Sequence, residues 1–349
     1  MRSSRMPDLH FTPRSGWIND PYGVTWRDGQ YHLFFQHVPG STVWAVGQHW
    51  GHATSPDLVR WTEQPLALSP DDTDGGVWSG CVVDVDGGRI FYTSVAVDAP
   101  AIGTVRLATP TDATWSGWDK QDGPVVVAPA DLELVEFRDP YVVHDGGEWR
   151  MVVGAGLADG TAAALTWTSP DLDVWTYGGV LASRHRDETD PVWTGSVWEC
   201  PQLLRLEGAW VLVVSVWADG ETLYEAAAVG ALVDGRFEAR SWQRLTWGAH
   251  YAGSAFTDAE GRTCLVHWLR GVEDVVAGWA GAHSVAHALR LDGDRVVVEP
   301  HPAVADQVLR AEDQQVLVDG HVVEVFGPGG VAGYVLRPSS GRRPRGRGW

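Results

Sequence analysis

The sequence predicts an all-β protein, and three observations support this prediction. Short segments rich in β-branched and aromatic residues recur along the chain, among them YHLFFQH, RIFYTSVAV and AWVLVVSVW. D-G and G-G pairs separate them, as in WRDGQYHL and DVDGGRIF, which is typical of β-hairpin turns. Long amphipathic helical patterns are nearly absent. We therefore expect a chain of consecutive β-hairpins.

The hairpins also repeat. ATSPDLVRW (53–61) returns as WTSPDLDVW (167–175), and ATPTDATW (108–115) is a weaker copy. When Ser55, Thr109 and Ser169 are taken as equivalent, the steps are 109 − 55 = 54 and 169 − 109 = 60 residues. A period of this size with several strands per unit is typical of propeller blades, and residues 15–300 have room for about five. A β-sandwich is the alternative architecture, but it gives no reason for a period.

Four polar residues stand at one phase of this repeat, in WINDPYG, WSGC, FRDP and WECP. They are Asp20, Ser79, Asp139 and Glu199, at steps of 79 − 20 = 59, 139 − 79 = 60 and 199 − 139 = 60 residues. Equivalent residues of successive blades lie at the same radius, so we expect these side chains to converge on the central axis. Because gathered carboxylates repel one another and lose water, three at one axis indicate a site.

Ordinary turn acids are the alternative, since Asp-Pro and Asp-Gly pairs often start turns. Asp28, Asp86 and Asp145 fit that explanation. Asp20, Asp139 and Glu199 fit it less well, because each has a large apolar residue nearby, and Asp20 and Asp139 are followed by proline. Proline fixes its own φ and pushes the preceding residue towards extended conformations, which sets where a carboxylate points.

Three carboxyl groups of this kind suit glycoside hydrolysis. A pair about 5–5.5 Å apart can act as nucleophile and as general acid/base through a covalent intermediate. That chemistry needs one ionised and one protonated carboxyl group. Glu199 has apolar neighbours and is expected to have the raised pKa, while Asp20 stays charged and Arg138 keeps Asp139 ionised. A metal site is the rival use, but an arginine beside a ligand opposes cation binding.

The composition narrows the partners. A nucleic-acid binder needs a basic face to neutralise phosphates, and the formal net charge of −19 argues against one, so no nucleic-acid partner is expected. No run approaches about 18 apolar residues, so no membrane partner is expected either. Cys81, Cys200 and Cys264 lack CxxC spacing, and no apolar stretch follows MRSSRM, which together predict a cytoplasmic protein without a signal peptide. The 20 tryptophans suit both β-rich cores and sugar-stacking surfaces.

At these residues the sequence resembles glycoside hydrolase family 32, the β-fructofuranosidases that include invertases, levanases and inulinases. WINDPYG, FRDP and WECP are similar to the three sequence blocks of that family. The stretch 31–61, VWSG, and YAGSAFTDAEGR (251–262) resemble further segments, so the resemblance covers roughly residues 10–300. It implies a five-bladed β-propeller with a funnel-shaped site and no metal or cofactor.

The resemblance also implies roles for single residues. Asp20 would be the nucleophile on the fructosyl anomeric carbon, and Glu199 the acid/base that protonates the leaving oxygen. Asp139, with Arg138, would hold the ring hydroxyls. His49 and His52 are expected to pack in the core rather than bind a metal. The positions that would line the fructose pocket are Asn19, Gln36, Trp44, Trp50, Ser79 and Arg138.

The chain departs from the family at several places. Tyr22 stands beside the nucleophile where the family usually has Asn, which leaves the acceptor, water or another sugar, open. Gln202 replaces a frequent Asp, and Cys81 a frequent Ser. Most members carry a C-terminal β-sandwich, whereas here QVLVDGHVVEVFGPGGVAGYVLRP offers two or three strands, expected as a short hairpin packed on the propeller. We thus expect a propeller over 1–300, a short β segment over 301–338 and a flexible basic tail over 339–349.

The expected function is a retaining β-fructofuranosidase acting on sucrose or short fructo-oligosaccharides. Three alternatives stay open: a fructosyltransferase with the same mechanism, an arabinose- or xylose-releasing hydrolase, and a carbohydrate-binding propeller that has lost activity. The expected partner is a small sugar, with no cofactor, and a homo-oligomer remains open.

Overall fold

The computed structural model describes residues 6–336 and is all-β, as the sequence predicts. The basic tail expected over 339–349 lies outside the described residues. In the first half of the chain, consecutive antiparallel strands form two groups of four. Their bounds are β1 (Gly16–Arg27), β2 (Gln30–Val38), β3 (His49–Ser55) and β4 (Thr62–Glu63), then β5 (Gly76–Val83), β6 (Arg89–Ala96), β7 (Ala99–Pro110) and β8 (Trp118–Lys120).

Two further groups of four follow in the same antiparallel order. Their bounds are β9 (Leu134–Asp145), β10 (Glu148–Leu157), β11 (Thr161–Ser169) and β12 (Thr176–His185), then β13 (Val197–Leu206), β14 (Ala209–Ala218), β15 (Glu221–Val233) and β16 (Arg236–Arg244). The last group is β18 (His250–Thr257), β19 (Thr263–Asp274), β20 (Trp279–His283), β21 (His287–Asp292) and β22 (Arg295–Pro300).

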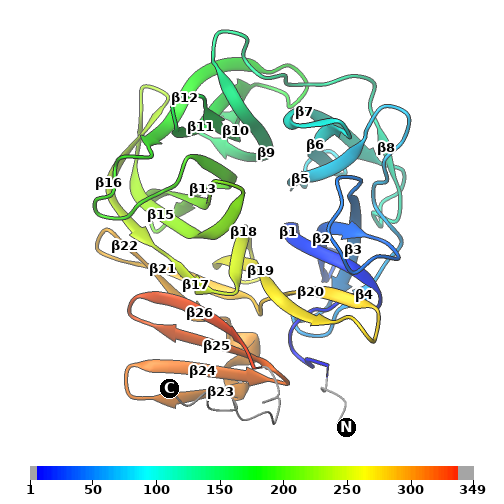
Figure 1. Ribbon diagram of the computed structural model, residues 1–349, viewed down its shortest axis with the longest axis vertical. Coiled ribbons are helices and arrows are strands. Elements are labelled where there is room, and N and C mark those ends of the chain that lie inside the picture. The colour runs from blue at the N-terminus through cyan, green and yellow to red at the C-terminus, as the bar shows by residue number, and fades with distance from the viewer. Residues whose placement is uncertain (1–5, 337–349) are drawn as a thin grey trace, which may run out of the picture.

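These groups lie in a ring around a common centre (Figure 1). The first strand of each group is innermost, and β1 contacts β5, β5 contacts β9, β9 contacts β13, and β13 contacts β18. β18 contacts β1, and β20 pairs in parallel with β1, so the end of the ring is joined to its beginning.

The predicted turns are confirmed. Asp28 and Gly29 have φ of 49° and 80°, and Asp86 and Gly87 have φ of 52° and 93°. Asp28-Gly29 makes a two-residue turn between Arg27 and Gln30, whose twist matches the paired strands, whereas Asp86-Gly87 turns the chain within the longer connection 84–88 between β5 and β6.

The repeated S-P-D-L segments also adopt one structure. After β3, the Ser55 hydroxyl lies 3.1 Å from the Asp57 carboxylate, which accepts backbone N–H groups, and Leu58 has a φ of 65°. After β11, Ser169 and Asp171 make the same contacts. The repeat therefore marks the same outer turn in two groups.

Each innermost strand carries a bulge. The pairing register shifts at Asp20 on β1, Ser79 on β5 and Asp139 on β9, and directly after Glu199 on β13 and Tyr251 on β18. A bulge bends the strand and re-aims a side chain. The chain is thus irregular at the positions where the sequence predicts a site.

A separate sheet packs at one edge of the ring, drawn in orange to red in Figure 1. It is larger than the short hairpin expected, because β23 extends it and β17, which precedes the last strand group of the ring, pairs in parallel with β26. We call it the C-terminal sheet; a short 3-10 helix, η1 (Pro302–Gln307), leads into it. Its strands are β17 (Thr246–Gly248), β23 (Val308–Ala311), β24 (Gln314–Asp319), β25 (Val322–Gly327) and β26 (Gly330–Val335).

The C-terminal sheet shares a core with the ring. Leu317, Phe326 and Val331 belong to one buried cluster with residues of β13, β14, β15, β21 and β22. The sheet also holds the start of the chain, because the Asp319 carboxylate accepts the backbone N–H groups of residues 8, 9 and 10. Across residues 6–336, we find no helix with the length and apolar character needed to cross a membrane.

Candidate active site

The Asp20 carboxylate lies in a polar network at the centre of the ring. Its Oδ1 accepts a hydrogen bond from Asn19 Nδ2 (2.9 Å), and its Oδ2 accepts one from Ser79 Oγ (2.7 Å). Gln36 Oε1 accepts a hydrogen bond from the same Asn19 amide (3.0 Å), and Asn19 Oδ1 accepts one from the Trp17 indole (3.0 Å). Both oxygens of Asp20 are therefore held in fixed directions by residues of β1, β2 and β5.

Asp139 and Asp20 both lie close to Cys200. Asp139 Oδ2 accepts the backbone N–H of Cys200 (3.0 Å). The Cys200 sulfur lies 3.6 Å from Asp139 Oδ2 and 3.8 Å from Asp20 Oδ2. Asp139 has a φ of 66°, and its own N–H donates to Thr93 Oγ1 (2.8 Å), so a strained backbone is anchored on β6.

Glu199 precedes Cys200 and is held by donors on both of its oxygens. Oε1 accepts hydrogen bonds from Arg138 Nε (3.2 Å) and Nη2 (2.9 Å), and Oε2 accepts a short one from the Tyr251 hydroxyl. Arg138 also binds Glu136. The Glu199 side chain keeps 16% of its surface exposed, so it is the more accessible carboxyl group beside the buried Asp139.

Burial raises the pKa of both aspartates. For Asp20, burial first and the charge of Glu199 second raise the pKa to about 6. For Asp139, burial outweighs the opposing effect of Arg138, and the pKa rises to about 7. The sequence had favoured Asp20 as the carboxylate that simply stays charged and Arg138 as the group that keeps Asp139 ionised. For Asp20 the structure differs because the carboxyl group is buried beside Glu199, and for Asp139 because the effect of burial exceeds that of Arg138, whose guanidinium is hydrogen-bonded to Glu136 and Glu199.

The two tryptophans expected in the pocket, Trp44 and Trp50, differ in their exposure to solvent. Trp44 is 44% exposed, and its ring meets the edge of Trp78, which also lies under Arg138. Trp50 is fully buried against Tyr22, with its N–H donated to the backbone oxygen of Trp78 (2.9 Å). Trp50 therefore supports the site from the core and does not line the pocket.

The structure also adds residues that the sequence reasoning did not name. Tyr251 comes from the last group of strands, and Thr93 and Glu136 lie on or beside the inner strands. The segment that starts at Tyr251 resembles a segment of the family, so the family resemblance could have pointed to Tyr251. The repeat could not, because the step 251 − 199 = 52 departs from the 60-residue period. Glu136 and Thr93 had no signal of this kind.

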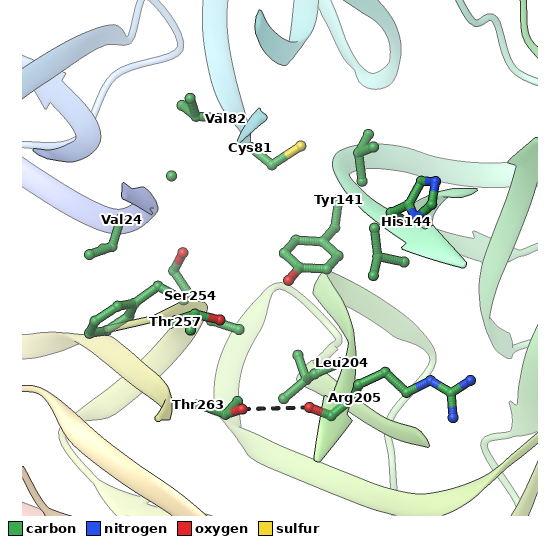
Figure 2. Close-up of a pocket in the computed structure, with 15 residues that line it drawn as sticks. Val24, Cys81, Val82, Tyr141, His144, Leu204, Arg205, Ser254, Thr257 and Thr263 are labelled. Carbon is green, nitrogen blue, oxygen red and sulfur yellow. Dashed lines mark hydrogen bonds between the residues drawn. The ribbon is translucent and has the colours of Figure 1, made fainter. Parts of the chain in front are cut away.

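The axis is hollow beyond the carboxyl groups. A cavity of about 350 Å³ is lined by residues further along the same inner strands, with Tyr141 pointing into it (Figure 2). Every inner strand contributes a site residue in its first half and a cavity residue in its second half. The labelled cavity residues on these five strands are Val24, Cys81, Val82, Tyr141, His144, Leu204, Arg205, Ser254 and Thr257.

A ring of antiparallel sheets with carboxyl groups on its inner strands is the arrangement of a propeller-type glycoside hydrolase. The family model for the glycosyl hydrolases family 32 N-terminal domain matches residues 10–300. The chain therefore belongs to glycosyl hydrolase family 32, as the sequence resemblance indicates.

Curated relatives agree with this assignment. The chain is 31% identical to the sucrose-6-phosphate hydrolase of Escherichia coli over 334 residues, covering 89% of this chain and 67% of the relative. It is 30% identical to the β-fructofuranosidase insoluble isoenzyme 7 of Oryza sativa subsp. indica, covering 85% of this chain and 55% of the relative. The chain thus spans between about half and two thirds of the length of these relatives.

Solved structures share the fold. The β-fructofuranosidase of Bombyx mori superposes with a TM-score of 0.83 at 22% identity, covering 96% of this chain and 90% of that one. The fructan 1-exohydrolase IIa of Cichorium intybus gives a TM-score of 0.83 at 19% identity, covering 97% of this chain and 93% of that one.

Proposed function

We propose that this chain is a retaining β-fructofuranosidase that hydrolyses terminal β-D-fructofuranosyl residues of sucrose or short fructo-oligosaccharides. The observation that carries the proposal is the meeting of Asp20, Asp139 and Glu199, from three different strand groups, around Cys200. Family membership supplies the reaction class. We further propose a five-bladed propeller up to about residue 300, supported by the closed contacts of the five inner strands.

In the first step, an oxygen of ionised Asp20 attacks the anomeric carbon of the fructosyl unit and the bond to the leaving oxygen breaks. Glu199 gives its proton to that oxygen and becomes a carboxylate. Arg138 and Tyr251 donate to this carboxylate and hold it in place. Asn19 and Ser79 each donate a hydrogen bond to one oxygen of Asp20. These hydrogen bonds fix the orientation of the carboxylate for attack on the anomeric carbon.

In the second step, Glu199 takes a proton from water, the water oxygen attacks the same carbon, and the bond to Asp20 breaks. Asp139, buried beside both groups, would accept hydrogen bonds from the ring hydroxyls. No metal or cofactor is needed for either step, because protein groups supply the nucleophile and the proton.

A fructosyltransferase is the nearest alternative, suggested by Tyr22. The Tyr22 side chain is 2% exposed and packs on Trp50 at a ring distance of 4.1 Å. A residue buried in this way offers little surface for a second sugar, which favours hydrolysis. The arabinose- or xylose-releasing hydrolase loses support through the family membership, and an inactive binding propeller through the retained carboxyl groups.

The test is cleavage of sucrose, sucrose 6-phosphate, inulin and levan by the full chain, with free glucose and fructose measured. We include the phosphorylated sugar because relatives named sucrose-6-phosphate hydrolase match the chain. Asp20→Asn and Glu199→Gln should each lower kcat by at least about a thousandfold while the protein stays folded. Asp28→Asn, in an exposed hairpin turn, is the matched control. Activity that survives both site substitutions would exclude the proposal, and fructose released short of glucose would identify transfer.

We also propose a cytoplasmic location. Within the described residues, Cys81, Cys200 and Cys264 are buried and unpaired, as expected in a reducing compartment. Fractionation of the source cells tests it, and recovery of the activity outside the cytoplasm would reject it.

A further inference from the structure

Five ionisable side chains gather in the core where the C-terminal sheet meets the ring. His250 on β18, His267 on β19 and His287 on β21 form what we call the histidine cluster, with Glu225 on β15 and Glu324 on β25 against it. All five are fully buried. One ring nitrogen from each histidine lies within 4.8 Å of the other two. The mechanism proposed above uses none of these groups.

The carboxylates approach the histidines closely. Glu324 Oε1 lies 3.0 Å from His250 Nε2, and Glu324 Oε2 lies 3.3 Å from His287 Nε2. Glu225 Oε2 lies 2.7 Å from His267 Nε2. Glu225 is fixed by its other oxygen, which accepts the backbone N–H of Gly253. Each histidine therefore has a carboxylate beside one of its ring nitrogens.

Several of these atoms nevertheless lack a hydrogen-bond partner among the described residues. Glu225 Oε2 and His267 Nε2 lie within hydrogen-bonding distance, but the angles at the two atoms do not allow a hydrogen bond. The Nδ1 atoms of all three histidines are also buried without a partner. An unsatisfied buried polar atom costs roughly 1–3 kcal/mol, so a stable core rarely collects several at one place.

Charge gives a second, independent argument. Glu225 and Glu324 bring two negative charges into a site without solvent exposure, where a charge needs a partner of opposite sign. The neighbouring His10 is committed to Asp319 at 2.8 Å and reaches Glu324 only at 3.8 Å. A divalent cation held by neutral imidazoles would balance both carboxylates and give the unpartnered nitrogens a ligand.

We propose that His250, His267 and His287 bind a Zn²⁺-class divalent cation that fastens the C-terminal sheet to the ring, with Glu324 of that sheet hydrogen-bonded to His250 and His287 from the second layer. Three imidazoles are a donor set typical of Zn²⁺, whereas Ca²⁺ and Mg²⁺ prefer oxygen ligands. Glu225 would orient His267 from the second layer, as carboxylates do at zinc-bound histidines. The sequence analysis expects no metal because of the family resemblance and the arginine beside the carboxylates; it does not consider these three histidines, which are 17 and 20 residues apart and form no compact metal motif.

The site would also steady the catalytic end of β18. His250 is followed directly by Tyr251, the donor to Glu199. The cation therefore has a structural role, and its removal should loosen Tyr251 without removing a group that touches the sugar.

The experiment is metal analysis and thermal unfolding of the full chain. We expect about one zinc per chain after expression in zinc-supplemented medium. Removal by a strong chelator should lower the Tm by at least about 4 °C, and Zn²⁺ at about a hundred times its dissociation constant should restore it. Co²⁺ in place of Zn²⁺ should give the visible absorption bands of a four-coordinate site.

His267→Gln and His287→Gln should each lose the bound zinc and the response of the Tm to added Zn²⁺. His32→Gln, at another buried histidine pair (His32 with His52), is the matched control and should keep both. Because the variants could fold poorly, the wild-type chain decides the matter. Absence of bound zinc together with a Tm that ignores both chelator and added Zn²⁺ would show a purely protonated network and overturn the proposal.

Discussion

At the scale of single residues, Asp20 sets activity against stability. Its pKa rises from 3.8 to about 6 on folding, because of burial first and the charge of Glu199 second. The folded protein therefore holds a proton more readily than the unfolded chain. This favours folding fully below about pH 4, and the contribution is lost as the pH rises through about 6. The ionised form required for attack is the form that destabilises the fold.

Replacing Asp20 by Asn should therefore stabilise the protein at high pH. A shift of about two pKa units corresponds to roughly 3 kcal/mol, less the hydrogen bonds that the amide makes poorly. We expect Asp20→Asn to gain about 1–3 kcal/mol at pH 8 and less than about 1 kcal/mol at pH 4. Urea unfolding at both pH values measures this, with Asp28→Asn as the exposed control. An equal gain at both pH values would contradict the linkage.

Tyr251 is expected to act through Glu199. Tyr251→Phe keeps the ring and removes the hydroxyl that donates to Glu199 Oε2, while the two hydrogen bonds from Arg138 remain. We expect kcat on sucrose to fall by about 10–100-fold with KM changed less than about threefold, since the hydroxyl steadies the acid/base and not the ground-state sugar. Tyr177→Phe, on an exposed part of β12, is the control. A raised KM at unchanged kcat would instead place Tyr251 in sugar binding.

The sequence was informative where a site residue obeys the repeat. Asp20, Ser79, Asp139 and Glu199 were grouped from steps of 59 and 60 residues alone, and the structure brings them together. Tyr251 was missed because the last step is 52. Burial was out of reach as well, since a pattern of residues does not state which apolar rings lie in the core. For this reason the full burial of Trp50, and the raised pKa values of the aspartates, required the three-dimensional packing.

At the scale of elements, the site depends on bulges in the inner strands. Asp139, Cys200 and Ala252 have φ of 66°, 45° and 53°, a region that costs most side chains roughly 1–2 kcal/mol. The sequence predicts the D-G hairpin turns but does not predict the positive φ values at these three positions. Turn chemistry is local, whereas a bulge is defined by the register with the next strand.

Gly80 tests the importance of the bulge on β5. A Cβ at this position would lie 2.0 Å from the backbone oxygen of Phe91 and 2.8 Å from the Cα of Tyr92, and neither atom can rotate away. We expect Gly80→Ala to lower the free energy of unfolding by about 3 kcal/mol or more. Activity should fall too, because the preceding Ser79 donates to Asp20.

The matched control is Gly327→Ala on β25, where the nearest atom to an added Cβ is Gln314 Cγ at 3.8 Å. Denaturant unfolding and sucrose assays compare the two variants. Similar effects of both substitutions would show that the close approach at β5 is unimportant.

At the scale of the whole molecule, the ring and the C-terminal sheet are expected to unfold together. In place of the expected hairpin, the structure has a five-stranded sheet whose residues belong to the same buried cluster as residues of the ring. Asp319 in that sheet also accepts hydrogen bonds from the backbone of residues 8–10. The sheet thus contacts the last strands of the ring and the segment that precedes β1. Since β17 precedes the last strand group of the ring, its pairing with β26 could not be predicted from the C-terminal sequence alone.

Phe326 gives the means to test this cooperativity. It is 1% exposed within the shared core, so Phe326→Ala should cost about 3–5 kcal/mol. Residues 301–336 contain no tryptophan, and of the tryptophans in the described residues only Trp247, on β17, lies in the C-terminal sheet, so tryptophan fluorescence in a urea titration reports mainly the ring. We expect the fluorescence midpoint to fall, because a loss in the sheet is felt by the whole cooperative unit. Val318→Ala, half exposed on β24, should leave it nearly unchanged. A fluorescence midpoint that stays fixed in Phe326→Ala, while circular dichroism shows an earlier separate transition, would mean that the sheet unfolds independently and that the ring needs no support from it.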